Sequence, residues 1–226
     1  MDRFNTAAYF EDMEPHDFLE NARRLLKGEG VVFIQIGSNE GIMSTDPLCD
    51  LILKEHWKGI LIEPVPRIFE KLKKNYAGHP QLFFENVAIS NTRKICNFYV
   101  VDETSDLIKT QPHLNEAGGL WGDLVGSLDR NHIFKCKPSL SDNEIKTLQV
   151  ECVTLQDIID KYQLDRIDVL HMDAEGHDEA ILLSINFEKI KPKIIIFEHI
   201  HMTLDTYLAC TNYLYSHGYS QRVGES

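Results

Sequence analysis

The chain is poor in positive charge and in long apolar runs, and each shortage excludes a class of protein. It has 23 Lys and Arg residues against 35 Asp and Glu residues, which gives a net charge of -12. A protein that binds nucleic acid needs a basic surface, and attachment to anionic membranes needs one as well. No apolar run approaches the ~20 residues that span a bilayer. We therefore expect neither nucleic-acid binding nor a membrane span.

The chain also lacks paired cysteines. Its five cysteines are odd in number, and none forms a Cys-x-x-Cys pair. This pattern disfavours a disulfide framework and a structural zinc site. The N-terminus has no charged-then-apolar secretory signal, so we expect a cytoplasmic protein with reduced thiols. With 226 residues, 43% of them hydrophobic, the chain is expected to form a single domain over residues 1–226.

Strand-like and helix-like segments alternate along the sequence. Apolar runs predict strands, and apolar positions three or four residues apart predict helices. The predicted strands are 31–36, 59–63, 82–89, 95–101, 150–154, 167–172 and 193–197, and the predicted helices are 14–26, 47–54, 64–75, 155–162, 179–184 and 207–217. Strands separated by helices favour parallel pairing with helices on both faces. We predict an α/β fold, with a helical cap over residues 1–30 and a lid or insert over residues 102–142.

The most informative segment is an apolar run that leads into a loop with two glycines. The run ends at Gln35-Ile36, the loop is Gly37-Ser38-Asn39-Glu40-Gly41, and Glu63 ends the next predicted strand. Glycines let the backbone approach a ligand, and the later carboxylate can accept hydrogen bonds from both hydroxyls of a ribose. Asn39 replaces the second glycine of a dinucleotide loop, and no phosphate-binding Lys follows. The pattern favours a nucleoside without a phosphate chain, such as S-adenosylmethionine.

Polar residues also follow the later predicted strands. Those residues are Asn86, Asp173, Glu175, Glu198 and His199. The carboxyl ends of parallel strands meet at one edge of a sheet, where ligands bind. Asp173 is the strongest candidate for a site residue. Glu198 and His199 cannot both face one cavity in an extended strand, because neighbouring side chains alternate.

Several of these residues have a structural alternative. Glu63 and Asp46 could each cap the helix that follows, and Asn39 could relieve a left-handed turn. Asn86 could be a turn residue at a strand end and not an adenine contact. His171, inside a predicted strand, is more often a hydrogen-bonded core histidine than a ligand. The sequence alone leaves these alternatives open.

Five ordered motifs together resemble the FkbM family of S-adenosylmethionine-dependent methyltransferases. The motifs are Ile34–Gly41, Leu61–Pro64, Asn86–Ser90, Asp173–Gly176 and Ile196–His199, and the resemblance runs from about residue 31 to 219. It implies a class I methyltransferase fold, which is Rossmann-like and doubly wound. The sheet of that fold is seven-stranded and mostly parallel, with an antiparallel C-terminal hairpin. The resemblance also implies methyl transfer to a hydroxyl of a sugar, glycan or natural-product acceptor.

The resemblance assigns roles by position. Cofactor-binding residues would be Gln35, Gly37, Ser38, Asn39 and Gly41 near the methionine part, Glu63 at the ribose, Asn86, Val87 and Ala88 at the adenine, and Asp173 near the sulfonium. The expected catalytic residues are Asp173 or His199 as the base that takes the hydroxyl proton, with Glu198 orienting its neighbour. A general base contributes roughly 10²–10⁴-fold. A divalent cation held by Asp173, Glu198 and His199 is the open alternative.

Two other classes of function remain possible from the sequence. An NAD(P)-dependent oxidoreductase of Rossmann type would also use a glycine loop and Glu63, but the third glycine and a Tyr-x-x-x-Lys pair are missing. A non-catalytic binding domain could keep the fold. The predicted insert carries His113, Trp121 and His132, a composition suited to holding a small-molecule or glycan acceptor. The sequence does not predict the oligomeric state.

Overall fold

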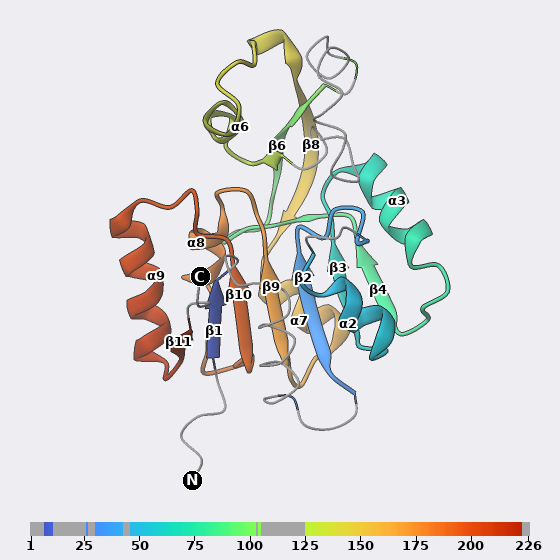
Figure 1. The fold of residues 1–226 in the computed structure, drawn as a ribbon, viewed down its shortest axis with the longest axis vertical. Helices are drawn as coiled ribbons and strands as arrows, with labels where there is room; N and C mark the ends of the chain where they lie inside the picture. Colours follow the sequence, from blue (N-terminus) through green and yellow to red (C-terminus); the bar gives the residue numbers. More distant parts are fainter. Residues whose placement is uncertain are drawn as a thin grey trace.

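A computed structural model describes residues 7–10, 26, 30–42, 46–102, 104 and 125–222. Its main layer is a seven-stranded sheet of order β11-β1-β10-β9-β2-β3-β4 (Figure 1). The strands are β1 (Ala7–Phe10), β2 (Val32–Ile36), β3 (Lys58–Ile62), β4 (Leu82–Glu85), β9 (Val169–Met172), β10 (Ile194–Phe197) and β11 (Ser220–Arg222). Every neighbouring pair of these strands is parallel. Their carboxyl ends therefore lie along one edge.

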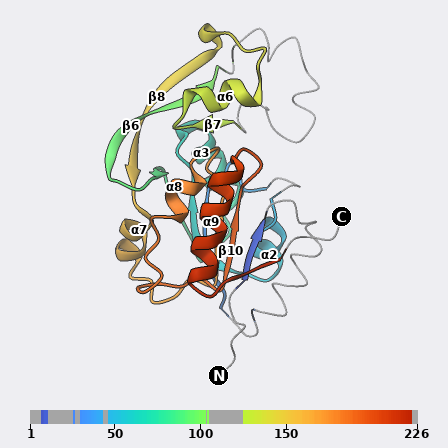
Figure 2. The same cartoon turned by 90° about the vertical axis from the view of Figure 1, so that its left-hand side faces the viewer.

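Helices cover both faces of this sheet. Successive strand residues point to opposite faces, and here the residues of both faces are apolar, so each face needs a covering layer. In β2, Phe33 belongs to one apolar core and Ile34 to the other. The core of Ile34 includes residues of α7 (Leu155–Tyr162), α8 (Asp178–Leu182) and α9 (Leu204–Ser216), whereas the core of Phe33 includes residues of α2 (Cys49–Lys54) and α3 (Pro66–Asn75). Figure 2 shows α7 and α2 on opposite sides of the sheet. None of the described helices has the length and apolar character needed to cross a bilayer.

A second, four-stranded sheet projects beyond the carboxyl edge of the first (Figure 1). Its strands, in the order β5-β8-β6-β7, are β5 (Ala88–Ile89), β8 (Ile145–Val153), β6 (Lys94–Val101) and β7 (Gly126–Ser127). The antiparallel ribbon of β6 and β8 carries α6 (Arg130–Cys136) and the short helix η2 (Asp142–Glu144). Val101, Val125, Ile133 and Leu140 form a small core there. We call residues 94–101 and 125–153 the lobe.

The predicted α/β class with a mostly parallel sheet is confirmed. One strand prediction is wrong: residues 82–89 form two strands, β4 and β5, in different sheets. The chain turns between them at Asn86, whose Nδ2 donates to the carbonyls of Glu63 (2.8 Å) and Pro64 (3.1 Å). Glu85 and Asn86 interrupt the apolar run of 82–89, and the two contacts of Asn86 fix the turn at that point.

The two ends of the described chain also differ from expectation. The prediction of an antiparallel C-terminal hairpin is wrong for the described residues: β11 pairs in parallel with β1. Helix α9 separates β10 from β11, and a helical crossover returns the chain in a parallel direction. Residues 7–10 are a strand where a helical cap was expected. Most of that cap, and most of the predicted insert including His113 and Trp121, lie outside the described residues.

Candidate functional site

A cavity of about 390 Å³ lies between the carboxyl ends of β2, β3 and β9 and the lobe. Its size is in the range of small-molecule and cofactor sites. Eight of the predicted cofactor residues line it: Gln35, Gly37, Ser38, Asn39, Glu63, Val87, Ala88 and Asp173. The lobe contributes Phe98, Gly126 and Leu128 to the opposite wall. The loops after β2, β3 and β9 therefore converge on one cavity.

The loops after β2 and β9 meet at Gly37. Its φ is +76°, and a Cβ there would lie 1.8 Å from the carbonyl oxygen of Asp173. The N–H groups of Gly37 and Ser38 both donate to the carbonyl of Ile62 at 3.0 Å. A side chain at residue 37 would separate these strand ends, so glycine is required for their close approach.

Glu63 is almost fully buried, at 5% exposure. Its Oε2 accepts from the N–H of Asn39 at 3.1 Å, and its Oε1 accepts from the N–H of Val65 at 2.8 Å. The carboxylate thus braces the glycine loop and also satisfies an amide at the start of α3. Glu63 therefore lies at the start of α3, as a capping role would require, and also lines the cavity. Two backbone amides orient the carboxylate there.

The cavity is acidic. Its lining carries the carboxylates of Asp46, Glu63, Asp173 and Glu175, and no Lys or Arg belongs to the lining among the described residues. His171 adds no positive charge, because burial lowers its pKa to about 4 and its ring is neutral at pH 7. Such a site attracts a cationic ligand and repels phosphate groups.

The sequence interpretation of Asp46 was incomplete. As expected for a cap, Oδ1 of Asp46 accepts from the N–H of Leu48 at 2.8 Å near the start of α2. Asp46 also lines the cavity, where its Oδ2 accepts from Gln35 Nε2 at 3.0 Å. Burial raises the pKa of this carboxyl to about 6, against the opposing effect of the Gln35 hydrogen bond. The local pattern Asp46-Pro47 predicts a helix cap, but it does not predict that Asp46 also lines the cavity.

Two predicted cofactor residues support the walls without lining the cavity. Gly41 lies against Tyr76, whose hydroxyl donates to the Gly41 carbonyl. A Cβ on Gly41 would lie 2.2 Å from the Tyr76 ring. Asn86 holds the loop after β3 through the two carbonyl contacts described above. Both residues hold the loops that carry the lining.

Glu198 and His199 follow β10 and are half-buried, but neither lines the cavity. Glu198 Oε1 lies 3.4 Å from His201 Nε2, and the His199 ring centre is 5.5 Å from that of Tyr207. Together with Asp173 they are not among the described side chains close enough to share one ion. The described residues therefore give no support to the alternative of a metal ion held by Asp173, Glu198 and His199.

The sequence interpretation missed the lobe wall and the histidines of the lining. His171 and His177 line the cavity together with Phe98, Gly126 and Leu128. The lobe residues carry no local signal, because their role depends on how the β6–β8 ribbon folds over the sheet. His171 follows the alternation of a buried strand, and that pattern alone does not separate a core histidine from a cavity residue.

The fold and the cavity define an α/β protein whose ligand site lies at the carboxyl ends of parallel strands, where open sheets of this class bind ligands. Comparison with known families makes the assignment more specific. The chain belongs to the FkbM methyltransferase family, because the Methyltransferase FkbM domain matches residues 35–220. Neither the curated proteins nor the solved structures provide a match. The predicted family resemblance is confirmed.

Proposed function

We propose that the chain transfers a methyl group from S-adenosylmethionine to a hydroxyl of a sugar, glycan or natural-product acceptor. One observation carries this proposal: four carboxylates and, among the described lining residues, no Lys or Arg surround the glycine loop. S-adenosylmethionine has a positive sulfonium and no phosphate. A nicotinamide dinucleotide has a negative pyrophosphate, which this lining would repel. The charge of the cavity therefore favours the methyl donor over NAD(P).

The residues of the lining suggest how the donor would lie. Glu63 would accept the ribose hydroxyls, because its carboxylate is already oriented by two amides. Val87 and Ala88 would contact the adenine. The loop from Gln35 to Asn39 would hold the methionine part, with Asp173 near the sulfonium. Gly41 and Asn86 would act indirectly, by holding the loops that carry these contacts.

The bound donor supplies an electrophilic methyl group, and the protein has to align the acceptor and remove its proton. Alignment alone can lower the barrier by about 7–11 kcal/mol in the best intramolecular models. Among the predicted catalytic residues, Asp173 is the best supported base because it lines the cavity. Glu198 and His199 follow the neighbouring strand β10 and would act indirectly, by orienting the residues that line the cavity. Removal of the proton by a general base adds roughly 10²–10⁴-fold.

Calorimetric titration with S-adenosylhomocysteine and with NADH tests the choice of cofactor. We expect the first to bind and the second not to bind. Glu63→Gln should weaken S-adenosylhomocysteine roughly 10–100-fold, because hydrogen bonds to a charged group contribute about 1.5–3 kcal/mol. NADH binding without S-adenosylhomocysteine binding would overturn the proposal.

Glu85→Gln is the matched control for this titration. Glu85 ends the adjacent strand β4 and is 8% exposed, similar to Glu63. It pairs with Lys161 at 2.6 Å and accepts from the Tyr162 hydroxyl, outside the cavity. Its substitution should leave the affinity unchanged. Transfer of label from methyl-labelled donor to glycan or metabolite fractions then separates an enzyme from a binding domain that keeps the fold.

A further inference from the structure

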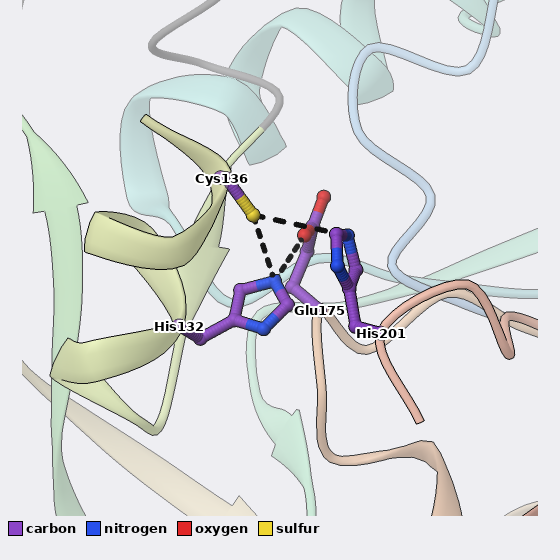
Figure 3. Close-up of side chains that lie close together, drawn as sticks. All are labelled: His132, Cys136, Glu175 and His201. Carbon is purple, nitrogen blue, oxygen red and sulfur yellow. Dashed lines mark hydrogen bonds and ion pairs between the residues drawn. The ribbon is translucent and has the colours of Figure 1, made fainter. Parts of the chain in front are cut away.

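Four side chains with metal-binding atoms meet where the lobe contacts the main sheet (Figure 3). His132 and Cys136 lie four residues apart on α6, so they share one face of that helix. Glu175 comes from the loop after β9, and His201 comes from the loop after β10. The ligand atoms of the four residues all lie within 4.8 Å of one another. Three separate segments of the chain therefore contribute to one cluster.

The separations are close to those of a tetrahedral zinc site. Cys136 Sγ is 3.3 Å from His132 Nε2 and 3.8 Å from His201 Nε2. His132 Nε2 is 2.8 Å from Glu175 Oε2. With Zn–N bonds of about 2.0–2.1 Å and Zn–S bonds of about 2.3 Å, tetrahedral geometry places ligand atoms roughly 3.3–3.6 Å apart. The remaining pairs of ligand atoms lie within 4.8 Å, so side-chain shifts of up to roughly 1 Å would bring the four atoms to these separations.

The chemistry of the ligands selects the metal. A thiolate and a carboxylate carry two negative charges, and two neutral imidazoles complete the set, so a divalent ion would be balanced. Sulfur and nitrogen ligands suit Zn²⁺, whereas Mg²⁺ and Ca²⁺ prefer oxygen. Four protein ligands close the coordination sphere, which is typical of a structural zinc site.

Contacts around the cluster hold its members in place. Gly176, at φ +87°, lies so close to His132 that a Cβ there would be 2.6 Å from Nδ1 of the imidazole. Ser127 Oγ of β7 donates to the Glu175 carbonyl at 2.7 Å. His132 itself is buried, at 3% exposure. The loop 173–178 is thus already seated against the lobe.

We propose that His132, Cys136, Glu175 and His201 bind one Zn²⁺ that fastens the lobe to the carboxyl edge of the main sheet. Glu175 also lines the acidic cavity. The ion therefore fixes the wall that the lobe and the loop 173–178 form together. The proposal does not depend on the identity of the cofactor, because the site is defined by its own ligands.

The test uses the full chain without a histidine tag, freed of metal and then titrated with Zn²⁺ in competition with a chromophoric chelator. We expect one Zn²⁺ per chain with submicromolar affinity and a raised Tm. Co²⁺ substitution should give the intense visible bands of a tetrahedral site and a thiolate-to-cobalt charge-transfer band. None of these measurements needs cofactor or turnover, so their failure is distinguishable from failure of the proposed methyl transfer.

Variants identify the ligands. Cys136→Ser should remove the charge-transfer band and weaken Zn²⁺ by at least roughly 10–100-fold, a loss that even outer partners of metal ligands can cause. His201→Ala changes an exposed side chain, so it tests the site even if Cys136→Ser does not fold. Cys96→Ser is the matched control, because Cys96 is also a half-buried lobe cysteine and lies outside the cluster.

Three outcomes would overturn the proposal. The first is a wild-type chain that takes up no Zn²⁺ at micromolar concentration, which would leave His132 and Glu175 as a simple hydrogen-bonded pair. The second is equal Zn²⁺ affinity in wild type and in both Cys136→Ser and His201→Ala. The third is a cobalt complex whose spectrum lacks the thiolate band.

Discussion

Buried aspartates lie at both edges of the main sheet, but their partners differ. At the amino edge, Asp168 is 2% exposed and pairs with Lys193 Nζ at 2.7 Å and Arg166 Nε at 3.4 Å. At the carboxyl edge, Asp178 is 1% exposed and accepts from the Ala174 N–H at 3.1 Å. Burial raises the pKa of Asp178 to about 7.

The contrast separates stability from binding. The protein neutralises Asp168 with its own cations, so the amino edge holds β2, β9 and β10 together. At the carboxyl edge the cavity has four carboxylates and no Lys or Arg in its described lining. Several carboxylates that share one partly buried cavity repel one another, which costs stability, and such arrangements are found at functional sites. The difference predicts opposite effects for the same substitution at the two edges.

Asp168→Asn should have the largest destabilising effect. The Asp168 carboxylate is buried, but the side chains of its partners Lys193 and Arg166 are 42% and 50% exposed and stay hydrated, so the loss should be roughly 1–3 kcal/mol. Urea unfolding measures the loss. Asp165→Asn, at an exposed position three residues earlier, should change the free energy of unfolding by less than about 0.5 kcal/mol. Equal stabilities for the two variants would contradict a stabilising role for Asp168 at the amino edge.

Asp178→Asn should instead stabilise the chain, with a dependence on pH. The pKa of Asp178 rises from 3.8 to about 7 on folding, so between these values the unfolded state loses its proton first. The contribution of this carboxyl to the free energy of unfolding of wild type is fully present below about pH 4 and is lost as the pH rises to about 7. The variant does not ionise, so its advantage should grow across this window, to on the order of 4 kcal/mol.

Unfolding of wild type and Asp178→Asn at about pH 4 and about pH 8 checks this sign. Comparing the two chains at each pH cancels the opposite contribution of His171, whose lowered pKa favours folding as the pH rises. Asp205→Asn, an exposed acid in the first turn of α9, is the control. An advantage that shrinks with rising pH would contradict a pKa of Asp178 that burial raises on folding.

Asp173→Asn should give the smallest free-energy change but the most specific one. If Asp173 lies near the sulfonium, its loss should weaken S-adenosylmethionine by roughly tenfold, or about 1.4 kcal/mol. S-adenosylhomocysteine has no sulfonium charge and should lose much less affinity. Calorimetry with both ligands measures the ratio, and Asp160→Asn on the exposed face of α7 is the control. Equal weakening of both ligands would place Asp173 away from the sulfur.

Elements with strong local signals could be predicted from the sequence. The helix over 155–162 has the predicted bounds, since Thr154 and Asp157 form a capping box within four residues. The glycine loop and Glu63 follow apolar strands, and they line one cavity with Asp173 as the strand-end argument predicts. Their roles toward a cofactor remain proposals. A turn at Asn86 is one of two interpretations of that residue, and the carbonyls of Glu63 and Pro64 that fix the turn belong to another strand end, 23 and 22 residues earlier.

The α/β class, the family and the segments that form the acidic edge follow from short sequence patterns, because periodicity and glycine spacing act within a few residues. Which carboxylates have a cation beside them, and which lobe residues close the cavity, depend instead on contacts between distant segments. The tertiary structure also brought Cys136 to His201, 65 residues away. The spacing His-x-x-x-Cys on α6 was a local hint of that cluster. Contacts between distant segments depend on how the lobe folds over the sheet, and no short stretch of sequence encodes that arrangement.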